Sequence, residues 1–490
     1  MFSPLTAFSS AVAIAAALIC FLVLKRWWRL PGRPLGEEGD LLEHCWRILL
    51  CCIFAGLGLE LTAMLIAGDV RDTTLVYAKQ LLFDLKGDDS WYPMLKASAQ
   101  LRDHPAVPIY QTIFFDHKIK FQYPLSALLL IDVPRRIFDL DDSGVLLMAR
   151  LVSRATVPFF IVTFVLLLVG AVRAEFGRRR HLELPLVTWI VLGLAGFFGI
   201  LFFYPLTRSE HLGQIQTLMS FDAAVALYAW QRRKTGLAGS LIGFCCIIKP
   251  QWCILFIWGL VRRQWRFVLW GAATAAVFLV WAAAVYGVSN TIDYVKVVTY
   301  LGKHGESFFA NQSVNGLLNR MLFNGNNQQW LANGFPPFNP IVYGATLISS
   351  VAFIGTALLW NRKNEPQSLD FALIMLAATI ASPIAWEHHY GIVFPIFALL
   401  LPACVRARPW GAWTIPLFGI GYILVSQDFS NVTSRLADSR FNVLQSSLLF
   451  GAFIIFALLC SCLRAAAVCA VPKPSAEDPL VASEAVTERA

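Results

Sequence analysis

Residues 267–287, with the sequence FVLWGAATAAVFLVWAAAVYG, contain no charged side chain. A helix of this composition is long enough to cross a bilayer, which takes about 20 apolar residues. Similar apolar runs recur along most of the chain of 490 residues, which is 57% hydrophobic and only 14% charged. Because an ordinary soluble domain carries about 25% charged residues, the composition excludes a soluble globular protein. It predicts an all-α polytopic membrane protein.

We predict about thirteen transmembrane helices from these runs. They cover residues 5–24, 46–67, 145–172, 184–204, 215–230, 236–248, 251–261, 267–287, 340–360, 369–381, 389–405, 410–426 and 445–463. Together they form one predicted transmembrane domain, residues 1–463. Residues 464–490 are predicted to be a disordered cytoplasmic tail, because they are rich in Pro, Ala, Ser and Glu.

The positive charges indicate the orientation of the chain. Basic clusters at 25–33, 173–180, 232–234 and 262–266 all fall on one side of the predicted spans, and the positive-inside rule makes that side cytoplasmic. The net charge of +9 is therefore mainly a topology signal. No basic face with readout elements suggests a nucleic-acid partner. We expect a multi-pass protein of the plasma or inner membrane, with the lipid bilayer as a partner.

Three longer loops, residues 68–144, 288–339 and 427–444, lie on the opposite side. They are richer in Asp, Asn, Gln, His, Tyr and Trp than the short linkers. Because the long polar loops are confined to one side, we expect the functional site on this non-cytoplasmic face.

The first of these loops opens with two aspartates. Asp69 ends a predicted span, and Asp72 precedes an amphipathic segment whose apolar positions fit one face of an interfacial helix. Asp72 stands where a carboxylate caps a helix N-terminus, so capping and catalysis both remain possible roles. Further along, Tyr123 begins a Tyr-Pro pair before an apolar run that is too short to span, which predicts a re-entrant or interfacial segment.

Polar residues beside apolar runs are candidates for an anion site. Arg208, His211 and Gln214 converge at the outer end of one predicted span. Lys249 interrupts apolar sequence, and a lysine at membrane depth costs about 2.5–3.5 kcal/mol, so it needs a partner or a function. Pro250 breaks the helix there, which is tolerated only in a protein-lined or wet cavity. Lys249 is thus a candidate anion ligand, with a snorkelling interfacial lysine as the alternative.

The second outer loop offers amide and hydroxyl groups. Asn311, Ser313 and Asn315 lie close together in it. Amides suit sugar hydroxyls because each offers a donor and an acceptor. A polar turn is the alternative interpretation of the same residues.

A third group, Trp386, His388 and His389, lies at an outer membrane edge. Adjacent histidines point in different directions, and no spaced third ligand accompanies them, which argues against zinc. Proton transfer or phosphate binding fits the pair better.

In this order and spacing, the motifs resemble the polyprenol-phosphate-sugar-dependent glycosyltransferases of glycosyltransferase family 87. The resemblance runs through residues 50–405 and rests on Asp72 to Tyr77, Tyr123-Pro124, Gly213-Gln214, Lys249-Pro250, Asn311 with Ser313 and Gly316, and Ser382-Pro383 with Trp386 and His388-His389. It implies a GT-C-type fold whose long first outer loop contains interfacial helices. Leu125 and Leu212 depart from the family pattern, which bears on the sugar and the acceptor more than on the reaction class.

The resemblance implies a membrane glycosyltransferase. Such an enzyme moves a hexose, most often mannose, with inversion, from a polyprenyl-phosphate sugar to a lipid or glycan acceptor at the outer face. Asp72 is implied as the general base, with Asp69 as the alternative base, and His388 or His389 as the family's histidine. The expected donor-binding residues are Lys249, Arg208, Gln214, His211, Tyr123, Asn311, Ser313, Asn315 and Trp386. A monophosphate donor held by cations needs no metal, so we expect no metal and no cofactor.

Two other classes of protein share some of these features. A flippase or transporter of polyprenyl-linked glycans also has outer loops and buried polar groups, although transporters often show two related halves with broken helices. The sequence contains one candidate break, at Lys249-Pro250, and no convincing matching half. A lipid-linked polysaccharide polymerase or ligase would use a diphosphate donor instead.

Overall fold

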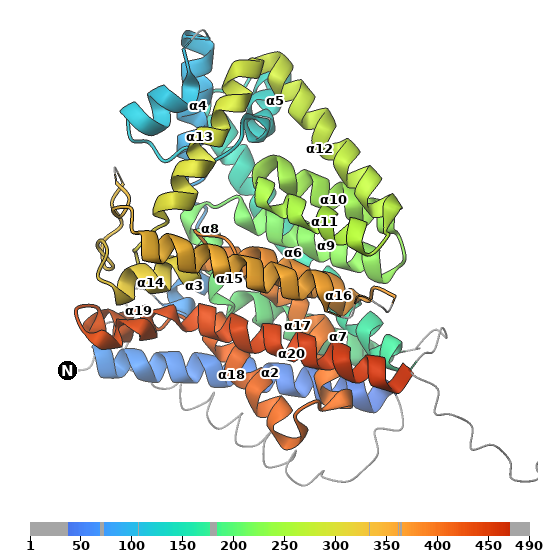
Figure 1. The fold of residues 1–490 in the computed structure, drawn as a ribbon. Coiled ribbons are helices and arrows are strands. Elements are labelled where there is room, and N and C mark those ends of the chain that lie inside the picture. Colours follow the sequence, from blue (N-terminus) through green and yellow to red (C-terminus); the bar gives the residue numbers. More distant parts are fainter. Residues whose placement is uncertain are drawn as a thin grey trace, which may run out of the picture.

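The computed structural model describes residues 38–68, 73–105, 107–176, 184–332, 334–360, 362 and 365–470. Within these ranges the regular elements are helices (Figure 1). The predicted first span, residues 5–24, lies outside the described residues, as do Asp69 and Asp72 and most of the predicted tail.

The first outer loop folds into short helices, as predicted. Helix α2 (Glu38–Ala67) precedes the loop, which contains α3 (Thr74–Phe83), α4 (Trp91–Asp103), the π-helix η1 (Gln111–Asp116), the 3-10 helix η2 (Leu125–Leu128) and α5 (Leu129–Phe138). Next come α6 (Asp142–Glu175), α7 (Leu186–Leu201), α8 (Tyr204–Leu212), α9 (Gln216–Gln231), α10 (Thr235–Ile248), η3 (Pro250–Cys253), α11 (Ile254–Val261) and α12 (Trp265–Tyr286).

The second half of the chain continues the helical pattern. It contains α13 (Val288–His304), α14 (Val314–Met321), α15 (Pro340–Leu359), α16 (Ser368–Ile380), η4 (Glu387–Ile392), α17 (Val393–Ala407), η5 (Gly411–Trp413), α18 (Thr414–Ser426), α19 (Ser430–Thr433), η6 (Ser434–Leu436), η7 (Arg440–Ser446) and α20 (Ser447–Ala470). Helix α20 runs past the predicted boundary at residue 463, because the alanines that follow favour helix.

The protein is a polytopic membrane protein, but thirteen spans are not shown. In the described part of the chain, six segments are long and apolar enough to cross a membrane: Glu38–Ala67, Asp142–Glu175, Trp265–Tyr286, Pro340–Leu359, Glu387–Ala407 and Arg440–Ala466. Helices α7 and α8 together would make a seventh, bent by 58°. Most of the other predicted spans are shorter helices, such as α10, α16 and α18. Turns at residues 232–234 and 262–264 and the break at Lys249 end α9, α11 and α10 before these helices reach spanning length.

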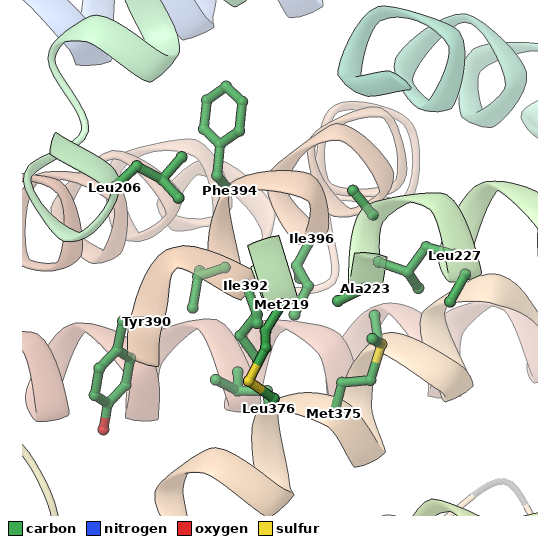
Figure 2. Packing of buried hydrophobic residues seen from close by; sticks show 14 of the residues in the cluster. Leu206, Met219, Ala223, Leu227, Met375, Leu376, Tyr390, Ile392, Phe394 and Ile396 are labelled. Carbon is green, nitrogen blue, oxygen red and sulfur yellow. The ribbon is translucent and has the colours of Figure 1, made fainter. Parts of the chain in front are cut away.

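Helix α17 forms the centre of the bundle, and 89% of the spanning window that contains it is buried. It packs against α2, α6, α18 and α20. Figure 2 shows how Met219, Ala223 and Leu227 of α9, Met375 and Leu376 of α16, and Ile392, Phe394 and Ile396 of η4 and α17 pack together. This apolar packing holds η4, the segment with the two predicted histidines, against α8 and α9.

Candidate active site

The N-cap of helix α3 is a threonine. The Thr73 hydroxyl accepts a hydrogen bond from the Val76 amide at 2.9 Å, so Thr73 is the N-cap. The Thr74 amide donates to the buried Glu60 carboxylate at 2.7 Å. The predicted helix is therefore confirmed, and its N-cap is Thr73 instead of Asp72. Asp72 itself lies outside the described residues, directly before this cap.

Arg208 extends from α8 toward α3. Its Nη1 donates to the Tyr77 hydroxyl at 2.5 Å, and its guanidinium lies 5.0 Å from the centre of the Tyr77 ring. The Tyr77 ring also lies against His211, with ring centres 4.8 Å apart, and against Tyr204, with ring centres 6.0 Å apart. Among the described residues, the buried Nε of Arg208 has no acceptor. Arg208 therefore has a donor left over for a group that these residues do not supply.

Lys249 lies at a break between helices, as predicted. Helix α10 ends at Ile248, and Lys249 is extended (φ −134°, ψ 95°), which the following Pro250 favours by sterically disfavouring helical geometry. Its Nζ lies 2.8 Å from Gln216 Oε1 and 2.5 Å from His389 Nε2. If the ammonium donates to Nε2, the neutral His389 ring carries its proton on Nδ1. In the described structure that Nδ1 is buried without a partner.

The 3-10 helix η4 carries three consecutive buried polar residues. Glu387 Oε2 accepts a hydrogen bond from the Tyr204 hydroxyl at 2.7 Å. His388 packs edge-on against His389, with ring centres 4.9 Å apart, and its buried Nε2 has no partner within the described ranges. The charges of Lys249 and Arg208 both act on His388. Tertiary folding thus brings Lys249 against His389 and places both predicted cations near enough to act on His388.

Asn311, Ser313 and Asn315 brace the second outer loop. The amide of Ala385 donates to Asn311 Oδ1 at 2.9 Å, and the Ser313 hydroxyl donates to the carbonyl of Pro383 at 2.9 Å. The amide of Glu306 donates to Asn315 Oδ1 at 3.2 Å. These groups bond to the protein itself and so support η4 from outside. Direct contact between them and a sugar stays a prediction.

Trp386 is held by the same contacts. It forms an isolated antiparallel bridge with Asn311, next to hydrogen bonds from the Gln312 amide to the Ala385 carbonyl (2.7 Å) and from the Glu387 amide to the Ala310 carbonyl (3.0 Å). Two motifs that are about seventy residues apart in the sequence therefore lie side by side.

Gln214 and Tyr123 also come together, through two residues that the sequence did not single out. The Gln214 side-chain amide donates to Asp89, and the Ser90 hydroxyl donates to Gln214 Oε1 at 2.6 Å. Ser90 Oγ also lies 2.8 Å from the Tyr123 hydroxyl. Asp89 and Ser90 lie in a polar loop with many other charged residues, so no local signal distinguishes them.

Gly213 allows this contact to form. It adopts a left-handed conformation (φ +69°), and a Cβ at this position would lie 2.3 Å from the carbonyl carbon of Gly87. The amide of Asp89 donates to the Leu212 carbonyl at 2.9 Å across the same contact. Only glycine fits both the backbone angle and the spacing, which explains the glycine of the Gly-Gln pair.

We expect Gly213→Ala to displace Asp89 and Ser90 from Gln214. The left-handed backbone alone costs about 1–3 kcal/mol for a residue other than glycine, and the overlap with Gly87 adds to that cost. Gly193→Ala is the matched control, because nothing lies within 4 Å of its Cβ position. Thermal unfolding of both purified variants in detergent should show a lower melting temperature for Gly213→Ala alone. Equal melting temperatures would contradict this role.

A buried ion pair joins the first and second outer loops. Lys120 Nζ lies 3.0 Å from Glu306 Oε2, and both side chains are buried. The ammonium also lies 4.3 Å from the centre of the Phe335 ring and 4.8 Å from that of Trp330. Burial lowers the pKa of Lys120, and the carboxylate of Glu306 opposes this shift. The ion pair therefore links the first predicted outer loop to the second.

The described chain contains no group of three or more His, Cys, Asp or Glu side chains that could hold a metal ion. The converging groups are instead two cations, a pair of imidazoles, neutral hydrogen-bonding groups and the carboxylate of Glu387, whose charge acts on Arg208. Cations with unused donors suit a phosphate or carboxylate ligand.

Comparison with known proteins connects this arrangement to a family. The model of glycosyltransferase family 87 matches residues 121–383. An alpha-(1->3)-arabinofuranosyltransferase of Corynebacterium glutamicum is 26% identical over 42% of this chain and 46% of its own length. A polyprenol-phosphate-mannose-dependent alpha-(1-2)-phosphatidylinositol pentamannoside mannosyltransferase of Mycolicibacterium smegmatis is 25% identical over 54% of this chain and 64% of its own.

A mannosyltransferase of the same description from Mycobacterium tuberculosis is 26% identical over 45% of this chain and 49% of its own length. The chain thus matches less than two thirds of each relative. No solved structure matches it significantly. The family match includes Tyr123, Arg208, Gln214, Lys249 and Asn311. Because it covers more than half of the sequence, the chain belongs to glycosyltransferase family 87.

Proposed function

We propose that this protein is a membrane glycosyltransferase that uses a polyprenyl-phosphate sugar as its donor. One observation carries the proposal: Lys249 contacts His389, the charges of Lys249 and Arg208 both act on His388, and the hydrogen-bond partners described for both cations are uncharged. A cation without a bound carboxylate retains its attraction for an anion. The family membership supports a lipid-linked phosphate as that anion.

In this proposal the phosphate of the donor binds Lys249, Arg208 and one histidine of the pair, His388 or His389. The acceptor hydroxyl attacks the anomeric carbon from the face opposite the phosphate, so the configuration inverts. The bond between that carbon and the phosphate oxygen breaks, and the cations stabilise the charge on the leaving phosphate. Asp72 takes the proton of the acceptor hydroxyl, with Asp69 as the alternative base. The scheme uses no metal and no cofactor.

The location of the reaction is part of the proposal. We place the site on the non-cytoplasmic face of the cell membrane, in a single transmembrane domain over residues 1–463 with a GT-C-type fold. About thirteen membrane segments result if the short apolar helices and residues 5–24 also count as spans. The concentration of basic residues in the linkers of the opposite side supports this orientation.

The choice of sugar rests on the descriptions of the relatives. Two of the three relatives are described as mannosyltransferases and one as an arabinofuranosyltransferase. We propose mannose, transferred to a lipid or glycan acceptor. The residues proposed to contact the sugar are Gln214, His211, Tyr123, Asn311, Ser313, Asn315 and Trp386.

A comparison of donors tests the proposed reaction. Membranes that contain the protein are expected to form labelled product from polyprenyl-monophosphate mannose and none from a polyprenyl-diphosphate sugar, because the site holds one phosphate close to its cations. Polyprenyl-monophosphate arabinose in a parallel assay decides between the two sugars. Transfer from the diphosphate donor alone would favour a polymerase or ligase. Movement of labelled lipid across vesicles without product would favour a flippase.

A further inference from the structure

A shallow pocket outside the proposed donor site contains a surplus of positive charge. It lies where the linker between α3 and α4 meets α6 and α8, and its lining includes Lys86, Trp91, Arg150, Arg154 and Glu210. Three of these residues are cations and one is an anion. The proposed glycosyl transfer uses none of them.

Two of the charged residues neutralise each other. Arg154 Nε lies 3.3 Å from Glu210 Oε2, and Glu210 Oε1 also accepts from the Ser153 hydroxyl. Arg154 donates in addition to the carbonyls of Leu81 and, at 2.7 Å, Asp84. The bonds of Arg154 are therefore directed to the protein, and they hold the linker against α6.

The other two cations keep most of their hydrogen-bonding capacity. Arg150 donates from Nε to the carbonyl of Gly87 at 2.8 Å, and this is the one side-chain bond that the described residues give it. Lys86 is 78% exposed and lies 3.7 Å from Asp84. An exposed pair of this kind contributes little. The two terminal nitrogens of Arg150 and the ammonium of Lys86 therefore remain available to an anion.

Arg150 borders an exposed apolar stretch of α6. Leu147 and Leu151 are three residues before it and one after it, and they lie one turn apart on the same face. Leu147 is 50% exposed and Leu151 is 52% exposed. Since α6 is one of the candidate membrane spans, exposed leucines on it are suited to contact lipid chains. An arginine in that setting is costly without a partner.

The end of α3 presents apolar groups to the same surroundings. Phe83 is 78% exposed and Leu82 is 47% exposed, and Lys86 follows them by three and four residues. Exposed apolar side chains three or four residues before a lysine are typical of a segment at the boundary between lipid chains and headgroups. The pocket therefore has apolar side chains on both sides and cations at its opening.

We propose that this pocket binds the phosphate of a membrane lipid, with Arg150 and Lys86 as its ligands and the lipid chains along the exposed face of α6. A guanidinium with two free terminal nitrogens matches a phosphate geometrically, and the lysine adds a point charge. Because Arg150 also holds Gly87, which packs against Gly213, the bound lipid would stabilise the loop that carries Asp89. This site is separate from the proposed donor site and does not depend on glycosyl transfer.

Native mass spectrometry of the full chain in a neutral maltoside detergent tests the site, with dioleoyl phosphatidic acid as the probe. Each cation near a lipid phosphate contributes about a fivefold gain in affinity, so Arg150→Gln and Lys86→Gln should each lower the affinity about fivefold and the double variant about twenty-five-fold. Lys79→Gln is the matched control, because Lys79 is an exposed lysine on the neighbouring helix α3. It should bind like the wild type.

Further binding measurements distinguish a lipid phosphate from free inorganic phosphate as the ligand. Dioleoylglycerol, which has the same chains without phosphate, should bind much more weakly, and inorganic phosphate should not displace the lipid. Lys249→Met should leave phosphatidic acid binding unchanged, so failure of the donor site and failure of this site are distinguishable.

Because Lys86 is exposed, its variant reports on binding even if Arg150→Gln is unstable. Unchanged affinity in Lys86→Gln and in the double variant, or equal binding of dioleoylglycerol, would overturn the proposal. Displacement by inorganic phosphate would do the same.

Discussion

Replacing Asp72 with asparagine is expected to lower the turnover number for sugar transfer about 10²- to 10⁴-fold, the usual contribution of a general base. The amide has nearly the same size as the carboxylate but cannot accept the proton of the acceptor hydroxyl. Because Thr73 caps α3 and Glu60 binds the next free amide, the substitution removes no cap from the helix. Folding should therefore be unaffected, and the loss should appear in catalysis alone.

The measurement is transfer from polyprenyl-monophosphate mannose by purified variants of equal melting temperature. Asp69→Asn tests the alternative base in the same assay, and Asp103→Asn, at the exposed end of α4, controls for the loss of one negative charge. Wild-type turnover in Asp72→Asn together with a large loss in Asp69→Asn would move the role of the base to Asp69. Wild-type turnover in both variants would refute a base in this segment.

Lys249→Met is expected to lower kcat/KM for the donor about 10- to 100-fold. A hydrogen bond to a charged group contributes about 1.5–3 kcal/mol, and the ammonium would contact the phosphate both in the bound donor and as it leaves. Methionine retains most of the apolar stem of lysine, so the packing around the helix break is preserved. Loss of the ammonium leaves His389 Nε2 and Gln216 Oε1 without their donor, which predicts a modest fall in melting temperature as well.

Steady-state kinetics at varied donor and fixed acceptor concentration checks this expectation. The effect should fall on the donor and leave the KM of the acceptor unchanged. Lys296→Met is the control, because this lysine is exposed on α13 and pairs with Asp293 at the surface. A donor dependence equal to that of the wild type would remove Lys249 from the phosphate site and leave it as a snorkelling lysine.

Several features of the fold could be predicted from the sequence because their signals are local. A charge-free run such as residues 267–287 predicts a spanning helix by length alone, and α12 occupies it. The proline after Lys249 predicts the helix break that separates α10 from η3. The number of spans was not predictable in the same way, since hydropathy does not distinguish a helix that crosses the bilayer from a shorter one inside the bundle.

The residues of the candidate site were also predictable only where they carry a local sequence signal. Lys249, Arg208 and the two histidines were identified because polar groups are costly in apolar sequence. Gln216, which binds Lys249, and Asp89, which binds Gln214, were not identified, because they lie beside ordinary polar or helical sequence and become relevant only through contacts. Lys249 and His389 are 140 positions apart, and Asp89 and Gln214 are 125 apart. No local pattern encodes such distances.

The sequence by itself therefore determined that the chain is helical and membrane-embedded, and which residue types are out of place in lipid. The tertiary structure decided that Lys249 of the helix break meets His389 of η4, and that Gly213 lets the loop of Asp89 reach Gln214. The physical reason is that hydropathy and backbone preference act within a few residues. A binding site arises from the packing of α3 on α8, of α10 on α9, and of η4 on α8, α9 and α17, which depends on the whole chain.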